Sequence, residues 1–468
     1  MAVWIFGRTR WLQRFKLRSS LQRWQYRRLR QFLRQARIRF QFYRNQAGPK
    51  SAHHFSPIPN GDPAGLLQDW PPINKAVMQA EFSALNAIGL DRQSALGIAR
   101  RAEAERDFRP QLQSLTIGLS SGTSGKPGLF LVSPVERLTW AAVILARGLD
   151  SISLRQLLLP WLQPLRIALF LRANSNLYEG LGSRRLQFAW FDLLAEPQQL
   201  RERLQQFQPH ILVAPASVLV WLSKESDGLL ALRALRQIFN AAEVLPAADR
   251  LAIEKRFGVR PQEIYQCTEG LLGISCQSGN LHLNEDFIYF EKEWLDERRF
   301  HPVLTDFSRS SQAFIRYRLD DILEIDPRPC PCQTSRLRIK QVVGRADEVL
   351  YFQRSAARDS SGGPGAPGDA SAWQPLFPDS VRQLMYSSAA VIRDYQITQY
   401  ADRLVLQLDL PTTAQSDQVV ARIRKDWQQR LKQLQLMCPP IVIQAWQARE
   451  PGAKQIRIRS LIKAVDRI

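Results

Sequence analysis

The stretch "IGLSSGTSGKPGLFLVS" (residues 117–133) places a loop rich in glycine and hydroxyl groups directly before an apolar run that is typical of a β-strand. Because glycine has no Cβ, such a loop can turn its backbone N–H groups toward a phosphate, and the hydroxyl groups and one lysine add further donors. We therefore predict a phosphate-binding loop made of Ser120, Ser121, Gly122, Thr123, Ser124, Gly125 and Lys126.

This loop is not of the Walker type. The Walker motif, G-x-x-x-x-G-K-[ST], requires glycine at the position of Ser120 and a magnesium-binding serine or threonine at the position of Pro127. For the isolated loop the alternative is an ordinary surface turn, because turns rich in serine and glycine are common. The remaining motifs of the chain decide between these two interpretations.

The chain is long enough for two or more domains, with 468 residues of which 45% are hydrophobic. Its formal net charge of +21 is unevenly distributed along the sequence. Fourteen Lys and Arg residues fall within the first fifty positions, and the first acidic residue is Asp62. The charge therefore describes a basic N-terminal segment and not a uniformly basic protein.

Residues 11–44 of this basic segment repeat apolar side chains at helical spacing, including Leu17, Leu21, Trp24, Phe32 and Phe40. We favour an amphipathic helix that packs on the globular body. The alternatives are peripheral contact with an anionic membrane or a partner, and a nucleic-acid-binding arm. No sequence-specific nucleic-acid binding is expected.

The sequence predicts neither a secretory signal peptide nor a transmembrane span. No apolar core of suitable length follows the early charges, and the best apolar run, residues 211–222, is too short for a bilayer and contains Pro215. Five cysteines without a secretory signal indicate a reducing, cytoplasmic location.

Short apolar runs alternate with amphipathic segments between residues 66 and 350, which predicts an α/β domain with largely parallel strands. Residues 354–373 are dominated by Gly, Pro, Ser, Ala and Asp and predict a flexible linker or loop. Beyond them, strand-like runs at 403–410 and 440–446 surround a helical pattern at 418–435. The expected parts are a basic helical segment (1–47), a large domain (66–346), the linker (354–373) and a small α+β domain (374–468).

Four later segments follow the glycine-rich loop: "YQCTEG" (265–270), "IRYRLDDI" (315–322), "VVGRADEVL" (342–350) and "REPGAKQIRI" (449–458). Together with "SSGTSGKPG" they resemble, in the same order, the motifs of the adenylate-forming superfamily of acyl-CoA synthetases, adenylation domains and luciferases. The resemblance implies a large α/β N-terminal domain with mixed sheets and helices, and a small mobile α+β C-terminal domain. Each segment alone has an ordinary structural explanation, but the ordered set favours the superfamily.

The resemblance also implies how ATP and Mg²⁺ are bound. Tyr265 would pack beside the adenine ring, Thr268 would face the phosphates, and Glu269 would hold the magnesium ion. Asp321 would bind the ribose hydroxyl groups, with Arg345 near the same sugar.

Two further residues are implied to act in catalysis through domain movement. Lys454 would bridge the carboxylate of the substrate and the α-phosphate during adenylation. Because Lys454 belongs to the small domain, that domain would close on the large one and then rotate about a hinge at Asp347.

Two positions depart from the superfamily's motifs. Gly128 stands where the superfamily has a lysine after the loop proline, which leaves Lys126 as the cation of the loop. The triplet "LDD" (319–321) replaces T-G-D before and at the ribose-binding aspartate.

Residues 171–181, 263–286 and 304–321 look most like the phenylacetate–CoA ligase-like branch. Within it they are closest to proteins related to deazaflavin-coenzyme adenylating synthetases and to capsule-biosynthesis adenylating proteins. The acyl pocket is expected between residues 171–180 and 214–222.

Four cysteine and histidine residues have the spacing of a metal site: Cys276-x5-His282 and Cys330-x-Cys332. Three thiolates and one imidazole would complete a tetrahedral structural zinc shell. Members of the ligase-like branch resemble this chain in carrying Cys/His pairs at these places. The alternative is buried apolar cysteines with a solvated His282.

We therefore expect ATP- and Mg²⁺-dependent activation of a small carboxylic acid as an acyl-adenylate, with release of pyrophosphate. The acyl group would then pass to CoA or to an acyl carrier protein. Positioning and electrostatic stabilisation suffice for this reaction without a protein nucleophile. One alternative is adenylylation of a phenolic or cofactor hydroxyl group without a thioester step, and another is a non-catalytic nucleotide-binding scaffold.

Overall fold

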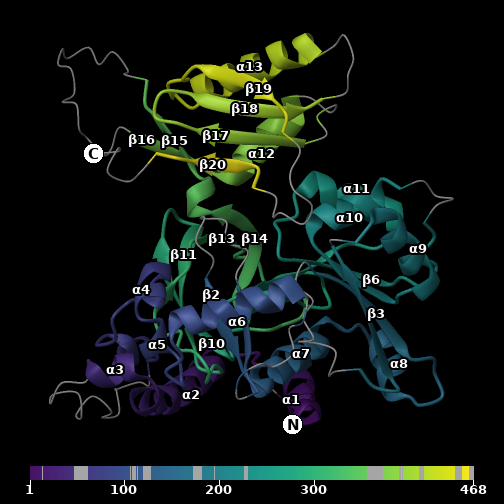
Figure 1. Ribbon diagram of the computed structural model, residues 1–468, viewed down its shortest axis with the longest axis vertical. Helices are drawn as coiled ribbons and strands as arrows, with labels where there is room; N and C mark the ends of the chain where they lie inside the picture. Colours follow the sequence, from purple (N-terminus) through teal and green to yellow (C-terminus); the bar gives the residue numbers. More distant parts are fainter. Residues whose placement is uncertain are drawn as a thin grey trace. The chain divides into compact units, whose positions relative to one another are not determined.

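The computed structural model describes the chain except residues 13, 47–61, 106, 108–111, 113, 120–127, 172–181, 194, 226–229, 356–372, 389–391, 393, 411–415, 448–455 and 463–468. The chain divides into two compact units (Figure 1). Unit 1 comprises Met1–Leu319 and Leu323–Gln341, and unit 2 comprises Asp320–Ile322 and Val342–Ile468.

The main sheet has twelve strands, and one part of it is parallel, in the order β7-β6-β5-β3-β4. Its strands are β3 (Leu165–Leu171), β4 (Leu186–Asp192), β5 (Ile211–Ala214), β6 (Gln237–Ala241) and β7 (Gln262–Cys267). One apolar cluster joins β3, β4, β5 and β6 to three helices, α9 (Pro197–Phe207), α10 (Ala216–Ser223) and α11 (Ala247–Phe257), which lie together in Figure 1. All four residues of β5 are buried, as expected for a strand of a covered parallel sheet.

The rest of the sheet is antiparallel from β7 onward. Its strands are β8 (Gly270–Ser275), β9 (Leu281–Leu283), β10 (Ile288–Trp294), β11 (Arg299–Asp306), β12 (Tyr317–Arg318), β13 (Asp321–Ile325) and β14 (Arg338–Arg345). The change of direction occurs in the β7–β8 hairpin, which turns through the two residues Thr268 and Glu269. The sheet is thus mixed, as the resemblance to the superfamily implied. The expectation of largely parallel strands over residues 66–350 was wrong, because the strands from β7 onward pair in antiparallel fashion and most are joined by hairpins or short turns.

A separate two-stranded sheet, β1 (Thr116–Leu119) and β2 (Leu129–Val132), packs in one apolar cluster with residues of α6 (Arg92–Glu105). Helix α7 (Pro134–Gly148) starts directly after β2 because Ser133 and Glu136 form a capping box. The other helices of this region are η4 (Ala64–Leu67), α4 (Lys75–Ala80), α5 (Phe82–Leu85) and α8 (Ser151–Leu158).

The N-terminal segment packs on unit 1, as favoured from the sequence. It forms α1 (Ala2–Gly7), a π-helical turn η1 (Arg8–Leu12), α2 (Arg18–Arg39) and α3 (Gln41–Asn45). In α2, the Trp24 indole N–H donates to the carbonyl oxygen of Asp286 at 2.8 Å. Leu17 precedes the helix and is exposed, which breaks the predicted apolar stripe at that position.

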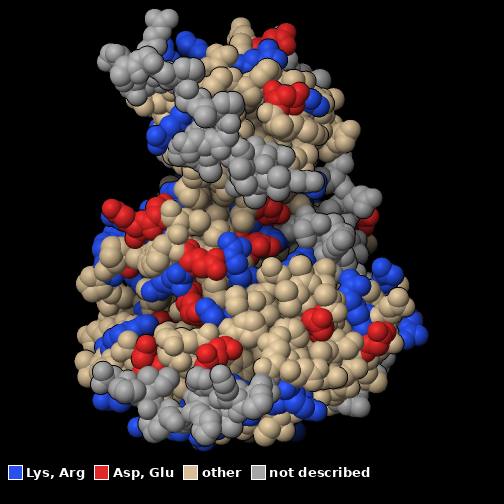
Figure 2. Space-filling view, turned by 90° about the vertical axis from the view of Figure 1, so that its left-hand side faces the viewer, with Lys and Arg blue, Asp and Glu red and all other residues tan. Residues whose placement is uncertain are grey.

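None of the helices in the described part of the chain combines the length and the apolar composition that a membrane crossing needs. On the face drawn in Figure 2, Lys and Arg side chains lie interspersed with Asp and Glu. The excess of positive charge therefore does not form one broad patch on that face.

Unit 2 is an α+β unit with a four-stranded sheet in the order β19-β18-β17-β20. Its elements are η6 (Ala346–Glu348), β15 (Leu350–Gln353), β16 (Trp373–Leu376), α12 (Pro378–Ser388), β17 (Asp394–Gln399), β18 (Leu404–Asp409), α13 (Ser416–Gln433), β19 (Ile441–Ala445) and β20 (Ile458–Ser460). The fully buried Trp427 of α13 belongs to the apolar cluster of this unit. The predicted linker lies almost entirely outside the described residues.

Candidate functional site

The β7–β8 hairpin carries three of the predicted nucleotide-binding residues. Tyr265 is buried, whereas Thr268 and Glu269 are partly exposed in the turn. The Thr268 hydroxyl donates a hydrogen bond to Oε2 of Glu269 at 2.9 Å. A partly exposed carboxylate in a tight turn is suited to bind a hard cation such as Mg²⁺.

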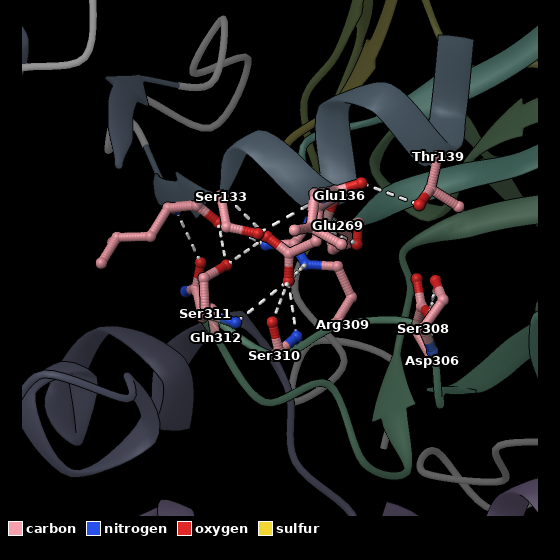
Figure 3. Close-up of polar contacts among 12 residues, drawn as sticks. Ser133, Glu136, Thr139, Glu269, Asp306, Ser308, Arg309, Ser310, Ser311 and Gln312 are labelled. Carbon is pink, nitrogen blue, oxygen red and sulfur yellow. Dashed lines mark hydrogen bonds and ion pairs between the residues drawn. The ribbon is translucent and has the colours of Figure 1, made fainter. Parts of the chain in front are cut away.

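The turn is held from behind by Arg309, whose side chain is completely buried (Figure 3). The Arg309 Nη1 group donates to the backbone carbonyl oxygen of Glu269 at 3.3 Å, and its Nη2 group donates to that of Leu131 at 2.6 Å. Leu131 belongs to β2, so one guanidinium connects the Glu269 turn to a strand more than one hundred residues earlier in the chain.

Glu136 of α7 provides the counter-charge, with Oε1 at 3.6 Å from Nε of Arg309. Its carboxylate also accepts hydrogen bonds from the N–H groups of Ser133 at 2.7 Å and Ser311 at 3.0 Å, and from the Ser311 hydroxyl at 2.6 Å. Burial opposes ionisation of this carboxyl group, but Arg309 and the N–H and hydroxyl donors outweigh it and hold the pKa of Glu136 below its usual value.

A second buried carboxyl group, Asp306, lies at the end of β11 beside this network (Figure 3). Its Oδ1 accepts hydrogen bonds from the N–H and hydroxyl groups of Ser308 at 2.8 and 2.6 Å. Its Oδ2 has no hydrogen-bond partner within the described ranges, and burial raises the pKa of Asp306 to about 6. A Cβ at Gly270 would lie 2.9 Å from Oδ2, so any other residue after Glu269 would require the Asp306 side chain to shift.

In unit 2, the predicted ribose and hinge residues lie close together. Arg345 Nη2 is 3.4 Å from an Oδ2 oxygen of Asp320, and Arg345 Nε is 3.5 Å from Oδ1 of Asp347. Burial by itself lowers the pKa of Arg345, but Asp347, then Asp321 and Asp320, outweigh it and raise this pKa. The structure therefore brings Asp321, Arg345 and Asp347 into one charged group.

The other predicted nucleotide-site residues fall outside the described part of the chain. They are the loop residues 120–126 and Lys454. Residues 172–180 of the expected acyl pocket are also outside it. The strands on both sides of the loop are described, and Leu119 of β1 pairs with Leu129 of β2.

The predicted metal ligands of unit 1 converge. The ligand atoms of Cys276, His282, Cys330 and Cys332 all lie within 4.8 Å of one another. The sulfur atoms of Cys276 and Cys330 are 3.6 Å apart, and the Cys332 sulfur is 3.5 Å from Nε2 of His282. A tetrahedral zinc ion with bonds of about 2.3 Å to sulfur holds its ligand atoms roughly 3.5–3.8 Å apart, so the 3.6 and 3.5 Å separations of these two pairs fit zinc.

The surroundings of the cluster also suit a metal. Nδ1 of His282 lies 3.0 Å from the carbonyl oxygen of Arg336, which places the ring proton on Nδ1 and leaves the Nε2 lone pair toward the sulfur atoms. A hydrogen bond from the Cys332 thiol holds the pKa of the Cys276 thiol well below its usual range, although burial opposes this.

Sequence reasoning missed Arg309, Glu136, Asp306 and the polar residues between them. In the sequence, Ser133 and Glu136 have only the spacing of a capping box, which predicts a helix start and nothing more. Arg309 is one of many arginines in the chain. Its buried position became evident only when the loop after β11 was seen against β2 and α7.

No known family model matches the sequence. A segment of 154 residues is 25% identical to protein CapK of Staphylococcus aureus, which covers 32% of this chain and 34% of that protein. The match thus spans about a third of the length of that curated relative.

Similarity of fold to one solved structure extends over 95% of the chain. A solved 2-hydroxyisobutyryl-CoA ligase in its postadenylation state, in complex with 2-HIB-AMP, matches 95% of this chain and 90% of its own, with 16% identity and a TM-score of 0.64. Bacillus subtilis o-succinylbenzoate CoA synthetase, in complex with its acyl-adenylate intermediate, matches 73% of this chain and 68% of its own, with 12% identity and a TM-score of 0.50. The chain therefore has the fold of the adenylate-forming CoA ligases, as the sequence motifs predicted.

Proposed function

We propose that the protein uses ATP and Mg²⁺ to activate a small carboxylic acid and then transfers the acyl group to a thiol. A carboxylate oxygen attacks the α-phosphorus of ATP, the bond to the β-phosphate breaks, and pyrophosphate leaves. The thiolate of CoA or of an acyl carrier protein then attacks the acyl carbon and AMP leaves. The observation that carries the proposal is the partly exposed Glu269 carboxylate at the hairpin turn of this fold.

Each predicted site residue would have a separate role in this reaction. Glu269 would hold the magnesium ion, which offsets the charge of the triphosphate, and the buried ring of Tyr265 would lie beside adenine. Asp321 and Arg345 would bind the ribose, because their charges already lie together. Lys454 would contact the reacting carboxylate, and positioned charges of this kind commonly contribute about 10²–10³ in rate.

An alternative is transfer of AMP to a phenolic or cofactor hydroxyl group without a thioester step. The fold neighbours favour the thiol route, because one solved 2-hydroxyisobutyryl-CoA ligase is in complex with both 2-HIB-AMP and CoA. A non-catalytic scaffold is disfavoured, since such a protein has no need of Glu269 beside a buried positioning network.

The test is pyrophosphate release by the purified full chain with ATP and Mg²⁺ across aryl, fatty, hydroxy and amino acids, with and without CoA. We expect acid-dependent release that rises with CoA and falls at least about 100-fold in Lys454→Ala and in Glu269→Gln. Arg422→Gln, an exposed residue of α13, is the matched control and should keep the wild-type rate. Release that is independent of the acid, or equal in all variants, would refute the proposal.

We also propose that Cys276, His282, Cys330 and Cys332 hold a structural zinc ion in unit 1. The supporting observations are the short separations of their ligand atoms and the orientation of His282. A shell of four protein ligands leaves no open position, so the ion would stabilise the fold and not take part in the reaction. We also propose a cytoplasmic location, because zinc-binding cysteines must stay reduced.

The basic N-terminal segment is proposed to contact an anionic lipid surface from the cytoplasmic side. Trp4 and Trp11 are 62% and 49% exposed, and Arg14 and Lys16, which follow Trp11 in the sequence, are exposed as well. Exposed tryptophans with nearby cations are typical of membrane-interface segments. The full chain should sediment with vesicles that contain phosphatidylserine and not with neutral ones, and Trp4→Ala/Trp11→Ala should weaken this. Equal sedimentation with both kinds of vesicle, or with neither, would refute it.

A further inference from the structure

Strand β2 has two edges, and polar side chains bond to the one that does not pair with β1. The Leu131 carbonyl oxygen accepts from Arg309 at 2.6 Å and from the Ser311 hydroxyl at 2.8 Å. The Leu131 N–H group donates to Oε1 of Gln312 at 3.0 Å, and Nε2 of Gln312 donates to the Leu129 carbonyl oxygen at 3.4 Å. Three side chains from residues 309–312 thus make the hydrogen bonds to this edge that a neighbouring strand would otherwise make.

The same segment is tied to the Glu269 turn through Arg309. The planar guanidinium presents several donors in a rigid fork, so it can fix two carbonyl groups at a set distance from each other. Here the two carbonyl groups are those of Leu131 and Glu269. The hydrogen bond to Leu131 is buried, so water is not available to replace it, whereas the bond to Glu269 is partly buried because its acceptor lies in the partly exposed turn.

Arg309 is itself held in place on several sides. Glu136 provides the opposite charge, and the aromatic rings of Trp140 and Phe314 lie 5.2 and 5.0 Å from the guanidinium carbon. Glu136 in turn accepts hydrogen bonds from the backbone of the loop that carries Arg309 (Figure 3). The guanidinium is therefore held in one position, from which it contacts β2, α7 and the hairpin turn.

We propose that Arg309 is a positioning residue for Glu269: it fixes the turn that bears this carboxylate against β2, so that the carboxylate is preorganised for its cation. The inference rests on the proposed function, in which Glu269 holds the metal of the metal–ATP complex. Groups that orient a metal ligand from behind typically change metal affinity about 10- to 100-fold when they are removed.

The test compares Arg309→Lys with Arg147→Lys. Lysine keeps the positive charge opposite Glu136 but lacks the planar guanidinium that donates hydrogen bonds to two carbonyl groups at once. Arg147 is an equally buried arginine of α7 that pairs with Asp286 at 2.6 Å and has no described contact with Glu269 or β2. Both substitutions lower the melting temperature, whereas the binding of Mn²⁺ with α,β-methylene-ATP should weaken about tenfold only in Arg309→Lys. Free Mn²⁺ is measured by electron paramagnetic resonance.

A second variant, Glu136→Gln/Arg309→Gln, removes both charges and keeps the chain folded if the lysine variant fails to fold. It should weaken Mn²⁺ binding to a similar extent. Unchanged Mn²⁺ binding in both Arg309 variants, or an equal loss in Arg147→Lys, would overturn the positioning role. Absence of Mn²⁺–nucleotide binding in the wild type, together with no pyrophosphate release, would instead overturn the proposed function on which it rests.

Discussion

The Cys/His cluster and the Arg309–Glu136 pair both lie inside unit 1, but their charges are balanced in different ways. In the pair, the chain supplies both signs, and the carboxylate of Glu136 is surrounded by N–H and hydroxyl donors. In the cluster, four electron-pair donors converge on one point. Thiolates crowded in this way repel one another unless a cation lies between them.

The two clusters therefore have different requirements for folding. A self-compensated ion pair needs only its own residues, and its energy depends on both partners being present. A set of metal ligands needs an ion from solution, so its stability depends on metal and on pH. Three predictions test this contrast, and they follow in order of decreasing expected effect.

The largest effect is expected at the Cys/His cluster. Cys330→Ser should abolish the binding of one zinc ion per chain and destabilise unit 1 by about 5 kcal/mol or more, because structural zinc binding contributes directly to folding. Metal content by mass spectrometry and melting by calorimetry measure the two effects. Cys438→Ser, in unit 2, is the control and should change neither. If the wild-type protein contains no zinc and its melting is insensitive to chelators, the cluster is not a zinc site. It would then not differ from the ion pair in needing a metal ion.

An intermediate effect is expected at the ion pair. Glu136→Gln leaves Arg309 buried without its main counter-ion and should cost about 3–5 kcal/mol of unfolding free energy, whereas Glu136→Gln/Arg309→Gln should cost clearly less. Denaturant unfolding of the two variants and of Arg309→Gln completes a double-mutant cycle. Additive losses would mean that the pair is not self-compensated.

The smallest effect is expected at Asp306. Its pKa is raised from an ordinary value of 3.8 to about 6, so between these two values the folded protein binds more protons than the unfolded chain. Stability therefore falls as the pH rises through this interval, by about 2 kcal/mol between pH 4 and pH 7. Asp306→Asn removes this titration and should be more stable than the wild type at pH 7. Equal pH dependence in the two proteins would show that the pKa of Asp306 is not raised in the folded state.

Much of the fold could be predicted from the sequence, because it follows from local patterns. The runs at 165–171 and 403–410 became β3 and β18, and the pattern at 418–435 became α13, each within one or two residues at its ends. The four residues of the predicted metal site could also be selected from the sequence, because cysteine and histidine are rare in this chain. The structure brings their ligand atoms within 4.8 Å of one another, and zinc binding itself stays a prediction.

The amino-acid sequence alone was enough to predict the alternation of helices and strands, the order of the candidate nucleotide motifs and the set of four Cys and His residues, since these depend on residue type and spacing along the chain. The burial of Arg309, Glu136 and Asp306 near the Glu269 turn became evident from the three-dimensional structure alone. Arginine, glutamate and aspartate are ordinary surface residues until burial removes their water, and burial is set by the packing of segments that lie far apart in the chain.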